Sequence, residues 1–336
     1  MTREPSARGA GSAVFPPAAG DTRRRDFLPR GRFWVGCLPW AWMLLFFLLP
    51  FVLIVNVSLS TPDLAVPPYV PPISLQPAAG QPVLHPDFGS YRRLGDELAA
   101  VATPGAELQY LRAFGNSLGV AGLTTLCCLL LGYPFAYHIA RSREGTRNTL
   151  LMLVMLPFWT SFLLRVYAWM GLLDSSEVGL LNQWLLALGV VDAPLQLLYN
   201  SGAVLVGMVY SYLPFMVLPL YANLVKLDVR LLEAARDLGA RPWTTFVSIT
   251  LPLSRRGIVA GSMMVFIPAV GEFVIPDLLG GGGVLMIGRR IWDDFGPNQD
   301  WPMAAVAVVM VVLLIVPIMV FHRHGGEDEH GGEAGR

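Results

Sequence analysis

Hydrophobic and polar positions alternate along this chain in long blocks. Six mainly apolar stretches of about 20 residues or more are separated by polar segments, and a bilayer core of roughly 30 Å needs about 20 apolar residues for each helix that crosses it. The stretches are residues 33–57, 114–140, 149–173, 201–222, 258–276 and 303–321. The pattern therefore predicts an all-α polytopic membrane protein with six transmembrane helices.

Composition predicts that lipid covers part of the surface, and the distribution of charge predicts the orientation in the membrane. Of the 336 residues, 54% are hydrophobic and only 14% are charged, and the mean hydropathy is +0.53, so lipid must cover part of the surface. With the N-terminus inside, the cytoplasmic segments hold 18 of the 24 Lys and Arg residues, and the outer segments hold 5. The positive-inside rule then predicts that both termini are cytoplasmic.

The blocks divide the chain into parts. They are a disordered cytoplasmic tail (1–32), a first transmembrane helix (33–57), an extracytoplasmic segment (58–113), a core of five transmembrane helices (114–322) with a cytoplasmic loop (223–257), and a cytoplasmic tail (323–336). Prolines exclude regular helix from the first half of the extracytoplasmic segment, whereas Tyr91–Arg112 is compatible with short helices on the membrane surface. The three cysteines, Cys37, Cys127 and Cys128, lie in apolar stretches and lack the spacing of a metal site or disulfide, so we expect small apolar side chains there.

A polar stretch between the fourth and fifth spans predicts a helix and a turn. Asp228 is placed to accept hydrogen bonds from the first turn of a helix, and Gly239 is placed to end that helix at positive φ. Apolar residues three and four positions apart give this helix one apolar face, made by Leu231, Ala234, Ala235 and Leu238.

A second short helix is expected directly after the turn. Pro242 suits its first turn, Trp243 and Phe246 share a face, and Pro252 ends it. A hairpin of this kind on the cytoplasmic side has two interpretations: it docks on a partner, or it lies as an amphipathic hairpin on the inner leaflet.

The spacing within this hairpin resembles the signature loop of binding-protein-dependent ABC importer permeases. That loop reads Glu-Ala-Ala, three residues, Gly, nine residues, Ile, one residue, Leu-Pro, and this chain matches it throughout. The resemblance implies a type I ABC importer permease fold in which the loop is a coupling helix that fits a cleft on an ATPase subunit. The implied ATPase-coupling residues are Glu233, Ala234, Ala235, Asp237, Gly239, Ile249, Leu251 and Pro252.

Other segments resemble the permease subunits of polyamine importers. These are NSLGVAGLTTLCCLLLGYPFAYHIAR, LPFWTSFLLRVYAWMGLL and VFIPAVGEFVIPDLLGG, and MIGRRIWDDFGPNQDWPMA and IVPIMVFHRH resemble the putrescine-type member. The resemblance implies a multi-pass protein of the bacterial inner membrane that imports putrescine or spermidine. The implied partners are a second permease subunit, a dimer of ATP-binding subunits that holds ATP-Mg, and an extracytoplasmic polyamine-binding protein. The chain itself is then expected to bind no cofactor, metal or nucleic acid and to have no enzymatic site.

Two ionisable residues within spans are candidates for a substrate pathway. Counted along straight helices from the cytoplasmic side, Arg165 lies at ~24 Å and Glu272 at ~21 Å, so both fall in the outer half. They either neutralise each other as a pair, or Glu272 forms a transient ammonium site together with Trp159, Tyr167 and Trp169.

Other functions fit the sequence less well. The run GGGGVLMIGRR lacks the Lys-Ser/Thr ending of a phosphate-binding loop, and the five histidines are scattered, which disfavours an ATPase or a membrane enzyme. A secondary transporter remains a rival class, but it has no use for the hairpin at 233–252. Within the permease class, another small organic cation or solute is the alternative substrate.

Overall fold

The computed structural model describes residues 30–75, 82–103 and 108–324. The chain divides into two units, Met1–Pro50 and Phe51–Arg336. Most of both predicted tails lies outside the described residues. The first unit contains α1 (Arg30–Met43), a π-helical turn (Leu44–Leu48) and the first residues of α2 (Leu49–Ser58). Within this run, Cys37–Ser58 is long and apolar enough to cross a membrane, as predicted for the first span.

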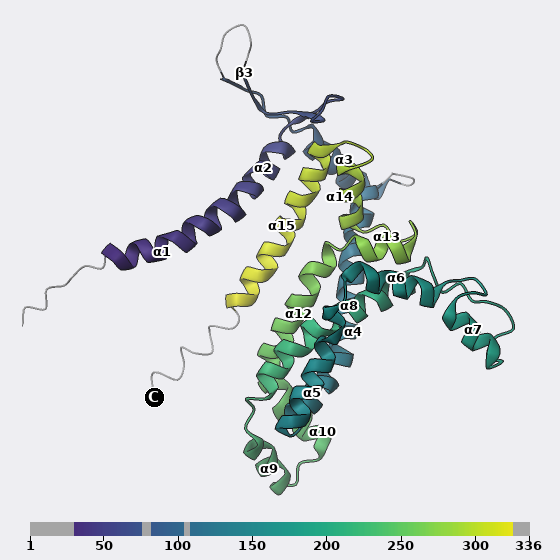
Figure 1. The fold of residues 1–336 in the computed structure, drawn as a ribbon. Coiled ribbons are helices and arrows are strands. Elements are labelled where there is room, and N and C mark those ends of the chain that lie inside the picture. Colours follow the sequence, from purple (N-terminus) through teal and green to yellow (C-terminus); the bar gives the residue numbers. More distant parts are fainter. Residues whose placement is uncertain (1–29, 76–81, 104–107, 325–336) are drawn as a thin grey trace, which may run out of the picture. The chain divides into compact units, whose positions relative to one another are not determined.

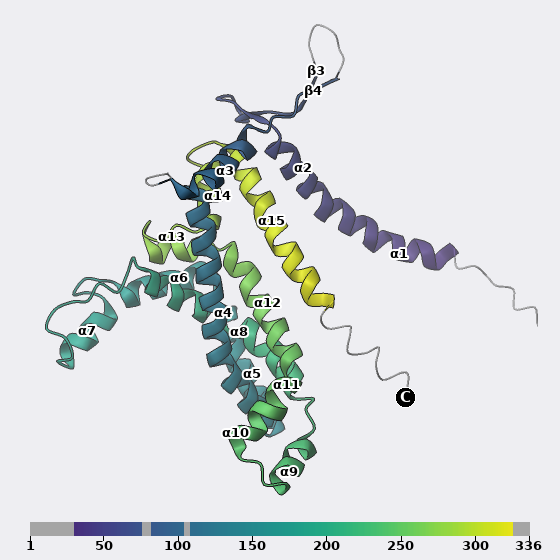
Figure 2. The ribbon, with the colours of Figure 1, turned by 180° about the vertical axis from the view of Figure 1, so that it is seen from behind.

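The core of the second unit is a bundle of α4 (Gln109–Arg141), α8 (Ser201–Leu224) and α12 (Arg255–Val270), which lie side by side in Figures 1 and 2. Fully buried Met216 on α8 fits between two glycines: a Cβ on Gly132 of α4 would lie 3.1 Å from its Cγ, and a Cβ on Gly261 of α12 would lie 2.8 Å from its sulfur. Small residues thus bring the three backbones close together, which favours helix association in lipid.

The predicted third span is broken rather than a single helix. It consists of α5 (Glu144–Met155), a 3₁₀ turn (Leu156–Trp159) and α6 (Phe162–Leu173), and the two halves meet at 89°. Pro157 stands at the start of the 3₁₀ turn, where its missing N–H prevents the α-helical ladder from continuing. The estimated depth of Arg165 assumed a straight helix and is therefore wrong.

The predicted fifth span is also shorter than expected. The helical run α10 (Pro242–Thr245), a π-helical turn (Phe246–Thr250) and α11 (Leu251–Leu253) meets α12 at 65°. Helix α12 ends at Val270, and a three-residue link leads to α13 (Val274–Gly280). Glu272 lies in this link rather than inside a transmembrane helix.

The helices are compatible with the predicted count of six spans. Among the described residues, Cys37–Ser58, Gln109–Arg141 and Ser201–Leu224 each satisfy the length and hydropathy of a span, and the two bent pairs do so jointly. The sixth stretch is the apolar part, Trp301–Pro317, of α15 (Trp301–His324).

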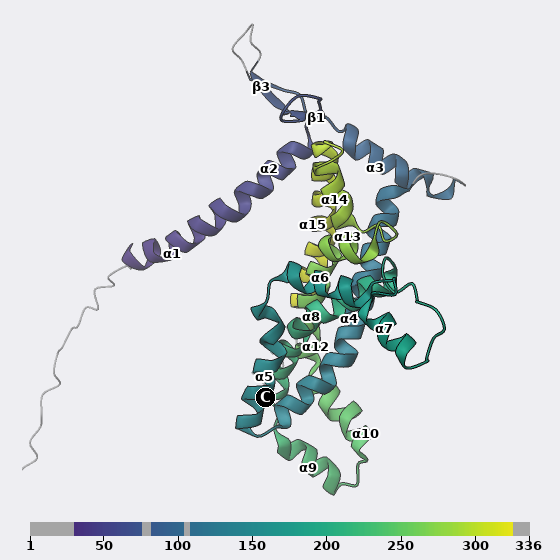
Figure 3. The same cartoon turned by 45° about the vertical axis from the view of Figure 1, so that its right-hand side comes forward.

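Short elements cover the end of the bundle opposite α9 and α10 (Figure 3). Two antiparallel pairs of strands, β1 (Thr61–Pro62) with β2 (Tyr69–Val70) and β3 (Ile73–Leu75) with β4 (Pro82–Leu84), occupy the proline-rich segment and were not predicted. The rest of this end is formed by α3 (Gly89–Ala99), a 3₁₀ turn (Ala100–Ala102) and α14 (Ile287–Phe295), and α15 packs against both helices. The remaining helix, α7 (Leu180–Ala187), follows α6.

Candidate functional site

The polar stretch forms the predicted hairpin at one end of the bundle. Helix α9 (Val229–Asp237) begins after Asp228, whose side chain accepts from the backbone N–H of Arg230 at 2.9 Å. Gly239 follows at φ +81°, a conformation that side chains rarely adopt, and Pro242 is the first residue of α10. The cap, the turn and the start of the second helix are therefore confirmed.

Helix α9 turns most of its apolar face outward. Leu232 and Ala235 are 5% and 8% exposed and form the buried side of the helix. Leu231 and Leu238, in contrast, are 48% and 88% exposed. Glu233, Ala234 and Asp237 are exposed as well. Only Ala235 of the predicted apolar face is buried, so the chain leaves an apolar strip at its end without a covering element of its own among the described residues.

The second helix of the hairpin continues one residue past its predicted end. Pro252 falls in the first turn of α11, where proline is tolerated because no intrahelical bond needs its N–H, and the run ends at Leu253. Ile249 is half-buried, and Leu251 and Pro252 are exposed.

Glu272 caps the N-terminus of α13. One carboxylate oxygen accepts from the backbone N–H groups of Phe273, Val274 and Ile275 at 3.2, 3.0 and 3.4 Å. The other accepts from the hydroxyl of Tyr212 on α8 at 2.5 Å. The carboxylate thus fixes the link between α12 and α13 to the centre of the bundle.

Arg165 does not pair with Glu272 among the described residues. Its guanidinium lies 5.1 Å from the ring centre of Phe158 and 5.7 Å from that of Phe162, which is cation–π geometry. Its Nε and Nη1 atoms are buried and have no hydrogen-bond acceptor in the described part of the chain. The predicted ion pair is therefore wrong.

Aromatic rings connect the two ionisable side chains instead. Phe158 meets Phe215 edge-to-face at 5.1 Å, and Phe215 lies 6.2 Å from Tyr212, which holds Glu272. The sequence analysis missed this series of rings, although Tyr212 and Phe215 stand three positions apart and so share one face of α8.

The three aromatic residues proposed from the sequence lie apart from this series. Trp159 and Tyr167 are 73% and 55% exposed, and Trp169 contacts Tyr210 edge-to-face at 5.4 Å. No hydrogen bond joins any of them to Glu272 among the residues that the structure describes. The structure therefore does not gather the predicted ammonium site around the carboxylate.

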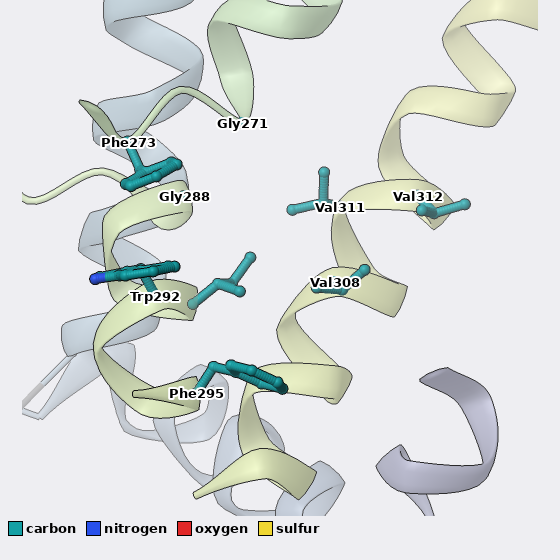
Figure 4. Close-up of a pocket in the computed structure, with 9 residues that line it drawn as sticks. Gly271, Phe273, Gly288, Trp292, Phe295, Val308, Val311 and Val312 are labelled. Atoms are coloured by element: carbon teal, nitrogen blue, oxygen red, sulfur yellow. The ribbon is translucent and has the colours of Figure 1, made fainter. Parts of the chain in front are cut away.

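An apolar groove of about 350 Å³ opens between α14 and α15 (Figure 4). Its lining includes the stacked rings of Phe273 and Trp292, whose centres are 5.2 Å apart, and Figure 4 shows the indole nitrogen directed away from the groove. The lining contains no carboxylate: it consists of Gly271, Phe273, Gly288, Ile291, Trp292, Phe295, Val308, Val311 and Val312. The groove therefore lacks the charge that an ammonium group requires.

At the end of the bundle opposite the hairpin, charged side chains contact one another and connect helices. Asp294, which is 1% exposed, accepts from the hydroxyl of Tyr110 and lies 3.3 Å from the guanidinium of Arg290. Burial lowers the pKa of Arg290, but the hydrogen bond to Tyr110 and the charges of Asp294 and Asp293 outweigh burial and raise it. This network joins α4 to α14 and keeps its acidic side chains engaged.

Comparison with solved structures supports the fold. A bacterial alginate ABC transporter, solved in complex with an alginate pentasaccharide-bound periplasmic protein, contains a chain that matches with a TM-score of 0.63 at 19% sequence identity, covering 89% of this chain and 94% of the other.

Sequence comparison identifies relatives and the family. The spermidine/putrescine transport system permease protein PotB of Haemophilus influenzae is 39% identical over 84% of this chain and 90% of its own length. The corresponding Escherichia coli protein is 38% identical over 84% and 94%. The family model described as the inner membrane component of binding-protein-dependent transport systems matches residues 128–324. The chain thus belongs to the family of inner membrane components of binding-protein-dependent transport systems.

Proposed function

We propose that this chain is a permease subunit of an ABC importer that brings putrescine or spermidine into the cytoplasm. The substrate class rests on the names of relatives that match 84% of the chain at 38–39% identity. The structural observation that carries the role is the outward apolar strip of α9, which directly precedes the bent connection into α12.

The proposed assembly has four kinds of subunit. This chain pairs with a second permease, the hairpin at 233–252 docks on one subunit of an ATPase dimer that holds ATP-Mg, and an extracytoplasmic binding protein delivers the polyamine. In this arrangement the hairpin and both termini face the cytoplasm, and the chain itself holds no cofactor.

Docking of the hairpin has a simple physical basis. Leu231 and Leu238 extend from α9 into solvent, and burying such a side chain in a cleft contributes about 1.5–3 kcal/mol. Glu233 and Asp237 on the same helix supply polar contacts at the rim. Movement of the ATPase subunits is then passed through α10 and α11 to α12.

The experiment that tests this function replaces Leu238. The 88% exposed side chain has room for a charge, so Leu238→Asp should fold normally and lose the co-purifying ATPase and ATP-driven polyamine uptake into vesicles. Gly239 is less suitable for this purpose because any side chain at φ +81° strains the backbone.

Leu64→Asp is the matched control. Leu64 is 99% exposed at the other end of the unit, between β1 and β2, so the same substitution there should leave ATPase association unchanged. Retained ATPase association and uptake in Leu238→Asp would refute the docking role.

The cation pathway is proposed along the rings that connect Arg165 to Glu272. A polyamine alternates ammonium groups with methylene segments, and aromatic faces together with a carboxylate stabilise both. Phe158, Phe215 and Tyr212 supply the faces, and Glu272 supplies the charge. Trp159, Tyr167 and Trp169 lie apart from these rings and are not part of the proposed pathway.

A further inference from the structure

A buried hydrogen bond fixes the bend between the hairpin and α12. Ser254 stands between α11 and α12, where the helix axis turns by 65°, and is fully buried. Its hydroxyl oxygen lies 3.0 Å from the carbonyl of Leu251 and 2.8 Å from the hydroxyl of Tyr133 on α4. Because the serine proton is donated to the Leu251 carbonyl, Tyr133 must be the donor to Ser254. The bend is thus attached to α4 by a bond with a defined direction.

The ring of Tyr133 continues this connection to the surface of the hairpin. It meets Phe246 edge-to-face at 5.5 Å, and Phe246 stacks on Trp243 at 5.6 Å. Trp243 is 74% exposed, and Phe246 begins the π-helical turn. Turns of this kind are frequent at functional sites in helices. Ring contacts therefore run without interruption from the exposed hairpin to α4.

Beyond the bend, α12 is closely packed against α8. A Cβ on Gly257 would lie 2.7 Å from the Cβ of Asn223, and a Cβ on Gly261 would lie 2.8 Å from the sulfur of Met216. Such close contact makes the two helices respond to a force as one body. Past the other end of α12, the hydroxyl of Tyr212 holds Glu272. A change in the angle at Ser254 consequently reaches the link that carries Glu272.

We propose that the Tyr133–Ser254 hydrogen bond sets the angle between the docking hairpin and α12 and thereby determines how much ATPase movement reaches the substrate pathway. This inference rests on the proposed permease function. Tyr133 and Ser254 are positioning residues, since both act through α12.

A spin-label experiment tests the angle without reference to any substrate. Labels are placed on Val247→Cys in the hairpin and Met264→Cys in α12, at positions 42% and 51% exposed, after replacing the three native cysteines by alanine. Tyr133→Phe keeps the ring on Phe246 but removes the donor, so it should broaden the distance distribution between the labels. Tyr137→Phe, one turn further along α4, is the control and should leave the distribution unchanged. An equal distribution in Tyr133→Phe and in the parent overturns the proposal.

The assembled transporter, reconstituted with putrescine, supplies the functional readout. Tyr133→Phe and Ser254→Ala should each lower putrescine uptake per ATP hydrolysed by about 3- to 10-fold, corresponding to roughly 0.7–1.4 kcal/mol, while the ATPase still co-purifies. The double variant should fall no further than the worse single variant, because one bond is removed in each case. Unchanged ratios, or effects that add in the double variant, contradict the proposal. Failure of the unsubstituted complex to import polyamine would instead contradict the proposed function, and the distance distribution would still decide the role of Tyr133.

Discussion

The carboxylate of Glu272 has a structural role as the cap of α13 and a proposed role as a contact for the transported cation. It accepts from Tyr212 and from three backbone N–H groups, so it positions α13, yet its side chain remains partly accessible. An ammonium group that reaches this link would contact the same carboxylate. The two roles can be tested separately, because contact with an ammonium group requires the negative charge, whereas capping α13 requires only an oxygen that accepts hydrogen bonds.

Glu272→Gln removes the charge and keeps an oxygen for the backbone N–H groups of α13. We expect at least about a tenfold lower rate of polyamine uptake, or ~1.4 kcal/mol, with ATPase association and thermal stability close to those of the parent. Glu272→Ala should show the same loss of uptake and also lower stability by about 0.5–2 kcal/mol, since the helix cap is lost. Parent-like uptake in Glu272→Gln would reduce this residue to a structural cap.

At the scale of single elements, the hairpin could be predicted because its signals are local. Asp228 before a helix, Gly239 at a turn and Pro242 at a helix start each act within a few residues, and all three are found in the structure. The break at Ser254 was anticipated by Pro252, whereas the break near Thr160 was missed although Pro157 marks it, and so was the end of α12 before Gly271. Apolar composition continues across both missed breaks, and hydropathy records that a segment is apolar but not that it bends.

The residues around Arg165 and Glu272 were harder to predict than the helices, because their contacts depend on tertiary packing. Phe158, Phe215 and Tyr212 come together only because the 3₁₀ turn after α5 places Phe158 against Phe215 of α8, and no spacing in the sequence connects residues from different elements. Trp159 and Tyr167 were expected beside Glu272 as aromatic residues of the third span, but they are 73% and 55% exposed and lie apart from the rings that contact Arg165 and Glu272. Tertiary packing, rather than aromatic content, determines which rings meet the charged residues.

The attachment of α14 provides a prediction for this element. Asp294→Asn leaves the partly buried cation of Arg290 without its carboxylate, and breaking a buried ion pair on one side costs about 3–5 kcal/mol. The melting temperature of the detergent-solubilised chain should therefore fall by several degrees. Asp277→Asn is the matched control, because the carboxylate that Arg289 contacts there is 47% exposed and such a pair contributes about 0–1 kcal/mol. Similar melting temperatures for both variants would show that Asp294 does not hold α14.

Helix length and the distribution of charge together predict how the second unit lies in the membrane. Helix α4 has 33 residues and spans ~50 Å, well beyond a bilayer core of roughly 30 Å, so part of it projects into water together with the elements packed around it. The hairpin and the strand pair β1–β2 lie at opposite ends of the second unit (Figure 1). The charge asymmetry along the sequence predicts that the hairpin end faces the cytoplasm.

Cysteine labelling in intact cells tests this orientation. Leu238→Cys and Leu64→Cys are placed in a background with the native cysteines replaced, and both positions are almost fully exposed. A reagent that does not cross the inner membrane should modify Leu64→Cys in cells with a permeabilised outer envelope and modify Leu238→Cys only after the inner membrane is disrupted. The expected difference follows from the sequence-based orientation, in which the predicted cytoplasmic segments contain 18 of the 24 Lys and Arg residues and the predicted outer segments contain 5, because translocating Lys and Arg is disfavoured. Labelling in the reverse order would place the hairpin outside, where no ATPase is present, and would overturn the docking role together with the orientation.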